Sequence, residues 1–296
     1  MKFRDAIEKF STWRRFKVKS LTVKGYDKEL RTFCLFLRNP DIEAIALGDV
    51  MEYLNGMQEL GWSHNSFIAK CMALRKFFEF YRLQGYRVLN EDLIPIPRKT
   101  FAIPRVVNDE DYQKLLSAIP TNQDPRHIRN RALINLLWDS GARNGEIVSL
   151  NVEDMDYNRQ RAVIKTEKSR GRRPMREIFW THGTNESLGA WVAKRATLNL
   201  MDGEALFVSA SGAKIGDRFT IRGVGEMLRR YANRAQMPCI NAHSFRHHMG
   251  HEIISRGGSA ADVMNVLGHA TLASSSVYTM MADRELEQRY RLIKGE

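Results

Sequence analysis

A proline-rich segment one third of the way along the chain divides it in two. Residues 95–99 read Pro-Ile-Pro-Arg-Lys, and a further proline stands at position 104. Proline has no backbone N–H and its ring clashes with the preceding turn, so this segment cannot continue a helix. We therefore expect two domains, at 1–94 and 108–296, joined by an extended linker at 95–107. A chain of 296 residues is long enough for both parts to bury a core.

The residues before the linker have the pattern of a helical domain. Apolar residues recur at helical spacing from Ser20 or Thr22 to about position 37, at about 49–60, and from position 64 to about Tyr81. Gly61 suits the end of the second helix, and Ser63 suits the N-cap of the third. This part of the chain is predicted to be entirely helical.

The residues after the linker predict helices with a few short strands. Asn108 can cap a helix, and an apolar helix at about 126–139 would end at Gly141. Strands are predicted at 161–165 and 176–180, around a turn rich in glycine and arginine, and a further short apolar strand at 205–208. Helices are expected from there to the end of the chain. The predicted fold class is mainly α with a small antiparallel β-sheet, in two domains.

The charge of the chain points to a polyanionic partner. Its formal net charge is +12 and its isoelectric point is near 9.7. Residues 1–100 hold 18 Lys and Arg against 12 Asp and Glu, a net of +6, which leaves +6 for the remainder. Both parts of the chain are basic, as expected if both contact DNA. In the first domain, Lys24, Lys28 and Arg31 lie at helical spacing and are the candidate DNA-binding residues.

Cysteine usage and hydropathy predict a cytoplasmic protein. Cys34, Cys71 and Cys239 are scattered and odd in number, which excludes a disulfide framework and a CxxC metal pair. The N-terminus has no apolar run of the signal-peptide type. The longest uncharged stretch, at about 263–282, is too polar to span a bilayer.

Two stretches of the second domain carry arginines in settings that suit phosphate binding. Arg143 follows a Gly-Ala pair, and Glu146 stands three positions later, close enough to orient the guanidinium if a helix begins near Asn144. Taken alone, this pattern favours an ordinary surface ion pair. His243 and Arg246 are also three apart and would share a helix face, so both can address one ligand.

A family resemblance joins these stretches to the end of the chain. In order, the sequence reads Ser-Gly-Ala-Arg-Asn-Gly-Glu at 140–146, Ala-His-Ser-Phe-Arg-His at 242–247, Leu-Gly-His at 267–269 and a tyrosine at 278. This order closely resembles the tyrosine recombinases of the phage integrase family, most of all their Xer-like members. Ala142 stands where the family has leucine, a change that affects packing more than chemistry.

The resemblance implies a fold and a reaction. It implies a helical, SAM-like core-binding domain followed by a catalytic domain, which together clamp DNA. Arg143, His243, Arg246 and His269 would hold the scissile phosphate, and Tyr278 would attack it to form a 3′-phosphotyrosyl intermediate. It also implies a homotetramer, or a tetramer with a partner recombinase, that exchanges strands between paired sites on double-stranded DNA through a Holliday junction. Neither metal nor ATP nor any other cofactor is expected.

The family supplies the proton for the leaving oxygen from a lysine between two strands. Lys165 and Lys168 are the candidates here, and Lys168 is preferred because it lies in the turn itself. The turn is longer and richer in arginine than the family pattern. Its Arg170, Arg172 and Arg173 are predicted to grip the DNA backbone.

Two other classes of function stay open at this point. His243, His247 and His251 are spaced along one predicted helix and raise the possibility of a metal-dependent nuclease, although position 248 is histidine where the HExxH pattern needs glutamate. A catalytically silent DNA-binding relative is the other alternative. The sequence leaves open whether the biological role is chromosome dimer resolution, phage or plasmid integration, or transposition, and which DNA sequence and accessory factors are used.

Overall fold

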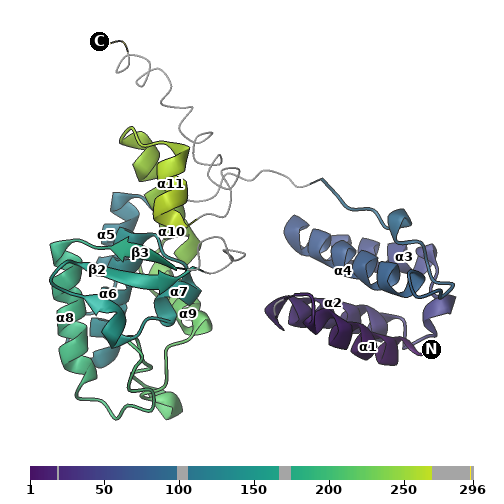
Figure 1. Cartoon of the computed structure of the whole chain (residues 1–296), viewed down its shortest axis with the longest axis horizontal. Coiled ribbons are helices and arrows are strands. Elements are labelled where there is room, and N and C mark those ends of the chain that lie inside the picture. The colour runs from purple at the N-terminus through teal and green to yellow at the C-terminus, as the bar shows by residue number, and fades with distance from the viewer. Residues whose placement is uncertain (19, 99–105, 167–174, 269–293, 295–296) are drawn as a thin grey trace. The chain divides into compact units, whose positions relative to one another are not determined.

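A computed structural model describes residues 1–18, 20–98, 106–166, 175–268 and 294 of the chain (Figure 1). The chain divides into two compact units, Met1–Ala102 and Ile103–Glu296. The predicted fold class is confirmed, because the described residues form helices and one small antiparallel sheet. Within those residues, no helix is both long enough and apolar enough to cross a membrane.

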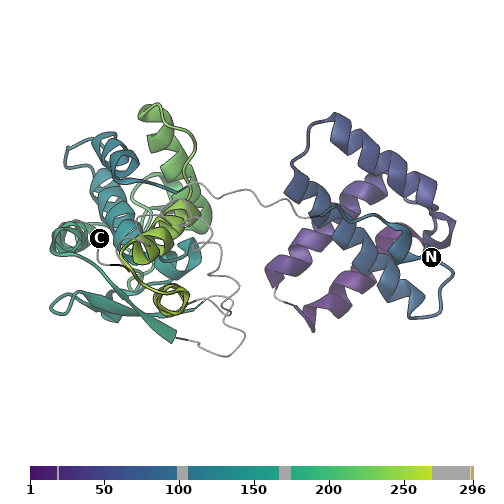
Figure 2. The same ribbon diagram turned by 90° about the horizontal axis from the view of Figure 1, so that it is seen from above.

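The first unit is a bundle of helices around an aromatic core (Figure 2). Its helices are α1 (Phe3–Arg15), α2 (Ser20–Phe36), α3 (Leu47–Glu59) and α4 (His64–Arg82), with 3-10 turns η1 (Ile42–Ala44) and η2 (Glu91–Leu93). The ring of Phe77 meets those of Phe3 at 5.0 Å and Phe10 at 5.7 Å, which ties α1 to α4. The predicted helices correspond to α2, α3 and α4, and Ser63 caps α4 as expected.

The second unit contains the sheet and the remaining helices. Its helices are α5 (Asp109–Ser117), α6 (Pro125–Ser140), α7 (Asn144–Val148), α8 (His182–Arg195), α9 (Ile221–Arg234), α10 (Ala242–Ser255) and α11 (Ala260–Leu267), with 3-10 turns η3 (Val152–Asp154) and η4 (Gly212–Lys214). Its strands are β1 (Met155–Asp156), β2 (Arg161–Lys165) and β3 (Met175–Phe179), in that order across the sheet. Ala162 pairs with Ile178, and both side chains are buried.

Helix α6 organises this unit. It packs against α8, α10 and β3, and it is buried around most of its circumference, with the polar Arg129, Asn130 and Asn135 among the buried side chains. Asp124 caps its N-terminus by accepting a hydrogen bond from the Arg126 N–H at 2.8 Å. Gly141 ends it in the left-handed conformation, at φ 55°, as the sequence predicts. Helix α7 begins shortly afterwards, at Asn144.

The strand predicted at 205–208 is wrong. Ala205, Leu206, Phe207 and Val208 are fully buried but form only isolated bridges, between Asn151 and Ala205 and between Val208 and Arg218. Their backbone groups pair with other loops: the Leu206 N–H donates to the Leu150 carbonyl at 2.8 Å. A short apolar run shows that a segment is buried, and whether it becomes a strand depends on the partner that the fold places beside it.

Candidate active site

Arg143 lies at the entrance of α7, where Glu146 holds it in place. Its guanidinium Nη1 donates to Glu146 Oε1 at 2.8 Å, and its backbone N–H donates to Oε2 at 2.9 Å. Helix α7 begins at Asn144, so the condition set by the sequence for this contact is met. The Arg143 side chain is 19% exposed and that of Glu146 is fully buried. The pair is therefore not the surface ion pair of the alternative interpretation.

A second arginine, Arg176 on β3, approaches the same carboxylate. Its Nη2 donates to Glu146 Oε2 at 3.0 Å, and its Nη1 donates to the Val266 carbonyl at the end of α11 at 2.6 Å. Its side chain is 6% exposed. Figure 1 shows α10 and α11 beside the sheet, and α11 packs directly against β3.

Glu146 is thus a single negative charge among several positive ones. Burial would raise its pKa, but the charge of Arg176, the Arg143 N–H and the charges of Arg143 and Arg246 together hold the pKa below the ordinary carboxyl value. Burial lowers the pKa of Arg176 in turn, although a guanidinium is basic enough to stay protonated in neutral solution. Three arginines around one carboxylate leave an excess of two positive charges, which suits a phosphodiester.

Arg246 comes from α10 and lies deeper than Arg143. It is 1% exposed, and its Nη1 donates to the Gly141 carbonyl at 3.1 Å while its Nη2 donates to the Leu267 carbonyl. One side chain therefore binds backbone carbonyls at the C-terminal ends of both α6 and α11. Because Gly141 leads directly into Ala142 and Arg143, Arg246 also fixes the backbone that presents Arg143.

The turn after α11 is built against Arg176. Gly268 is left-handed, at φ 65°, and a Cβ placed there would lie 2.7 Å from Arg176 Cδ and 3.2 Å from Thr166 Cγ2. Only glycine fits without displacing these neighbours. The described end of α11 is therefore held by Arg176 and Arg246, which bind the carbonyls of Val266 and Leu267.

The histidines of α10 lie on two sides of the helix. The ring of His243, whose side chain is exposed, lies 4.5 Å from that of His247. Burial, together with His243 and Arg246, lowers the pKa of His247 to about 4, so this ring is neutral at neutral pH. His248 points elsewhere, stacking on Trp138 at 3.7 Å.

The histidine cluster does not support a metal site. Throughout the part of the chain that the structure describes, no three His, Cys, Asp or Glu side chains are grouped so as to hold a metal ion. Two of the three candidate ligands, His243 and His247, do lie together, but a zinc site needs at least three protein ligands. The metal-dependent nuclease therefore has no structural support from these residues.

Several predicted site residues lie outside the described residues. They are Lys168, Arg170, Arg172, Arg173, His269 and Tyr278. Of the two candidate general acids, only Lys165 is described: it is the last residue of β2, is exposed and pairs with Met175.

The basic residues predicted on the first unit gather between α1 and α2. Lys24, Lys28 and Arg31 line a shallow hollow of about 320 Å³ together with Arg15. Arg31 is partly neutralised there, because its Nε donates to Asp27 at 2.7 Å. The lysines and Arg15 therefore carry more of the positive charge of this surface than Arg31 does.

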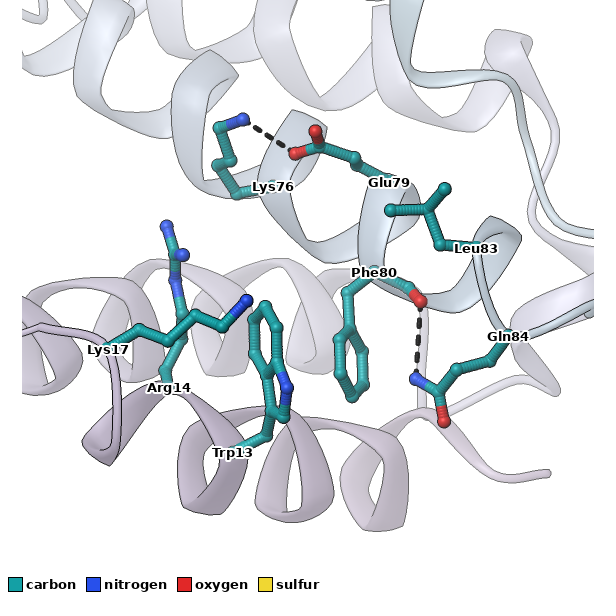
Figure 3. Close-up of a pocket in the computed structure, with 8 residues that line it drawn as sticks. All are labelled: Trp13, Arg14, Lys17, Lys76, Glu79, Phe80, Leu83 and Gln84. Atoms are coloured by element: carbon teal, nitrogen blue, oxygen red, sulfur yellow. Dashed lines mark hydrogen bonds and ion pairs between the residues drawn. The ribbon is translucent and has the colours of Figure 1, made fainter.

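A second hollow of the first unit lies between the C-terminal ends of α1 and α4 (Figure 3). It encloses about 480 Å³, with the rings of Trp13 and Phe80 at 4.5 Å from each other. The Lys17 ammonium lies 4.4 Å from the Trp13 ring centroid, and Lys76 pairs with Glu79 at 2.6 Å. Most of its cations are thus already engaged by neighbouring side chains.

Comparison with known proteins identifies the family of the second unit. The sequence model described as the phage integrase family matches residues 105–285, more than half of the chain. The chain belongs to the phage integrase family. The resemblance drawn from the four short stretches is thereby confirmed.

Relatives of this integrase-family chain extend over both units. It is 26% identical to a protein named tyrosine recombinase XerC from Vibrio campbellii over 277 residues, covering 91% of this chain and 84% of the relative. It is also 26% identical to a protein of the same name from Oceanobacillus iheyensis over 279 residues, covering 91% and 88%.

Solved structures show the same fold. The structure of the Tn1549 transposon integrase in complex with transposon right end DNA superposes with a TM-score of 0.74 at 18% identity, and the match covers 98% of this chain and 99% of that one. The XerH site-specific recombinase in a post-cleavage complex with its difH substrate gives 0.69 at 21% identity, covering 93% and 80%. A lambda integrase dimer on a core site gives 0.73 at 14%, covering 94% and 77%.

Arg176 was not among the site residues predicted from the sequence. It appeared there only as the first residue of a predicted strand. A signal was present: strand alternation places Arg176 on the same face as Ile178, which is buried in the core. An arginine on the inward face of a strand needs a buried partner, and that partner is Glu146.

Proposed function

We infer that the protein is a tyrosine-type site-specific DNA recombinase. The observation that carries this inference is the convergence of Arg143, Arg176 and Arg246 around the fully buried Glu146, in a chain of the phage integrase family. A phosphate clamp of fixed guanidinium groups stabilises the pentavalent transition state of a phosphodiester without a metal ion.

We propose the following roles for the site residues. Arg143 and Arg246 neutralise the scissile phosphate from two sides, and His243 and His269 donate hydrogen bonds to its oxygens. His243 is available for this role because its side chain is exposed at the start of α10. Glu146 is a positioning residue that acts through Arg143.

The reaction then proceeds by transesterification. The phenol oxygen of Tyr278 attacks phosphorus, the bond to the 5′-oxygen breaks, and Lys168 gives that oxygen its proton. The products are a 3′-phosphotyrosine and a free 5′-hydroxyl. Attack of a 5′-hydroxyl from the partner duplex reverses the step, so the phosphoester is conserved and no ATP is needed.

DNA binding is proposed for basic surfaces on both units. On the first unit these are Arg15, Lys24 and Lys28 between α1 and α2, with Arg31 beside them. On the second unit they are the arginine-rich turn, with Arg170, Arg172 and Arg173, and the polar face of α9. That face carries the exposed arginines 222, 229, 230 and 234, which the sequence analysis did not single out. Contacts of this kind bind the DNA backbone without reading its sequence.

The assembly follows from the reaction. Strand exchange between two duplexes needs two active protomers per site, so we propose a tetramer on DNA, either of this chain alone or with a partner recombinase, and a Holliday junction between the two exchanges. We place the reaction in the cytoplasm, where free thiols such as those of Cys34, Cys71 and Cys239 persist.

A cleavage assay with Arg143→Ala tests the proposal. Losing one guanidinium from the charged transition state is expected to slow cleavage about 10²–10³-fold, by analogy with a lost oxyanion donor. DNA affinity should change little, because binding is spread over many backbone contacts. Arg143 is a better choice than Arg246, because loss of Arg246 would also leave two buried carbonyls without their hydrogen-bond donor. Cleavage at the wild-type rate by a folded Arg143→Ala protein would remove this arginine from the site.

A further inference from the structure

Arg176 connects two parts of the candidate site that are far apart in sequence. Through Nη2 it reaches Glu146, which orients Arg143, and through Nη1 it reaches the Val266 carbonyl at the end of α11. We propose that Arg176 is a positioning residue for strand cleavage: it sets the phosphate clamp on α7 and the end of α11 at a fixed distance from each other. This inference rests on the proposed function.

The contacts around Arg176 leave little freedom between these parts. Glu146 accepts hydrogen bonds from both arginines, so a shift of Arg176 moves the carboxylate that aligns Arg143. Gly268 packs against the Arg176 side chain, and a Cβ at that position would lie 2.7 Å from its Cδ. The chain continues from Gly268 to His269, a proposed phosphate ligand. One side chain thereby determines the relative placement of α7 and the C-terminal end of α11.

Stability alone does not explain a buried arginine here. The Arg176 side chain is 6% exposed, and its Nε has no hydrogen-bond partner among the described residues. A buried donor without a partner costs free energy, and apolar residues of similar volume often replace buried ion pairs without loss of stability. Arg161, on the neighbouring strand, shows the ordinary arrangement: it is 33% exposed and pairs with Glu177 at the surface.

The position of β3 gives this arrangement a further consequence. Arg176 is the second residue of β3, and in the sequence it follows the segment that carries Lys168. Its contacts with Glu146 and Val266 therefore fix the beginning of β3 relative to the phosphate clamp.

The test compares Arg176→Met with Arg161→Met as the matched control on the same sheet. Single-turnover cleavage of a nicked target duplex and DNA affinity are measured for the full-length proteins. A misplacement of about 1 Å costs about 100-fold in rate, so Arg176→Met should cleave about 100-fold more slowly. Its DNA affinity should fall less than about threefold. Arg161→Met should match the wild type in both measurements.

Two further variants separate positioning from folding. Arg176→Lys keeps the charge beside Glu146, but a single ammonium cannot also reach Val266 in the same geometry, so only part of the rate should return. If Arg176→Met unfolds because it leaves the Glu146 carboxylate buried without its counter-charge, the Glu146→Gln/Arg176→Met double variant removes both charges. That protein should fold, and it should cleave about as slowly as Glu146→Gln alone, because both substitutions release Arg143.

A double-mutant cycle with Arg143→Ala decides the mechanism. Because Arg176 acts in part through Arg143, adding Arg176→Met to Arg143→Ala should cost about tenfold, well short of its effect of about 100-fold alone. The inference would be overturned if the losses in cleavage rate of the two single variants multiplied fully in the double variant. A wild-type cleavage rate for folded Arg176→Met would also overturn it. In either case, a wild-type protein that forms the covalent adduct would leave the proposed function standing, whereas a wild type that forms none would refute the function itself.

Discussion

Replacing Glu146 by glutamine perturbs the site at the group on which its arginines converge. Glu146 is fully buried and accepts hydrogen bonds from the Arg143 N–H at 2.9 Å, Arg143 Nη1 at 2.8 Å and Arg176 Nη2 at 3.0 Å. Glutamine has the same shape but no charge. The side-chain NH₂ group of glutamine would also place an N–H donor against one of the arginine N–H groups that donate to the carboxylate.

The expected loss of stability is large. Removing one member of a buried ion pair typically costs about 3–5 kcal/mol, because the partner charge is left uncompensated. Here two guanidinium groups lose their counter-charge. Glu177→Gln is the matched control, since Glu177 is 43% exposed and pairs with Arg161 at 2.6 Å. A surface pair of that kind is worth about 0–1 kcal/mol.

The assay is denaturant unfolding of the full-length protein, monitored by tryptophan fluorescence, together with cleavage and DNA binding. Glu146→Gln should slow cleavage about 100-fold by loosening Arg143. It should bind DNA at least as tightly as the wild type, because the site gains one net positive charge. A loss of less than about 1 kcal/mol, equal to that of Glu177→Gln, would refute the reasoning.

The pH dependence gives a second check on the same variant. The pKa of Glu146 is held below its ordinary value, so its contribution is fully present above the unfolded carboxyl pKa of about 4.3 and is lost as pH falls through the lower folded value. The stability difference between the wild type and Glu146→Gln should therefore be constant from pH 8 to 5 and should shrink in acid. A difference that grew in acid would contradict the ionised state assigned to this carboxylate.

Three further predictions address neighbouring parts of the second unit. Gly141→Ala should lose about 2 kcal/mol or more of unfolding free energy by calorimetry, because its φ is 55° and a Cβ would lie 2.9 Å from a Leu267 methyl; an unchanged melting temperature would contradict the packing described. Because the pKa of His247 is lowered to about 4, the unfolding free energy of the wild type should fall about 2–3 kcal/mol further than that of His247→Gln between pH 6.5 and pH 4. Parallel curves of stability against pH for the two proteins would argue against a ring that burial keeps neutral. Lys168→Ala should cleave normal DNA slowly and recover most of its rate on 5′-phosphorothiolate DNA, whose sulfur leaves without a proton. Lys165→Ala should cleave both substrates almost as fast as the wild type. Rescue of Lys165→Ala by the phosphorothiolate would reverse the assignment of the general acid.

Local sequence signals predicted the elements that depend on neighbouring residues. Ser63 and Asn108 cap helices as expected, and Gly141 ends α6 in the left-handed conformation that favours glycine. The contact between Arg143 and Glu146 was predictable for the same reason, because three positions at a helix start bring the two side chains together.

Local sequence patterns could not predict the contacts between segments that are distant in the chain. The partners of Arg176 lie 30 residues before it and 90 residues after it, and no local pattern pairs these positions. The carbonyls that Arg246 binds carry no side-chain signal at all. The apolar run at 205–208 was taken for a strand because burial and strand formation leave the same trace in a short segment.

Trapping the covalent intermediate tests the central claim most directly. The wild-type protein is incubated with a nicked duplex that carries its target site, so that the cleaved strand diffuses away and religation is blocked. The account predicts a denaturation-resistant protein–DNA adduct, linked through Tyr278 in peptide mapping, that forms in the presence of a chelator. Tyr278→Phe should bind the duplex and form no adduct. An adduct that persists in Tyr278→Phe, or cleavage by the wild type without any adduct, would contradict the account.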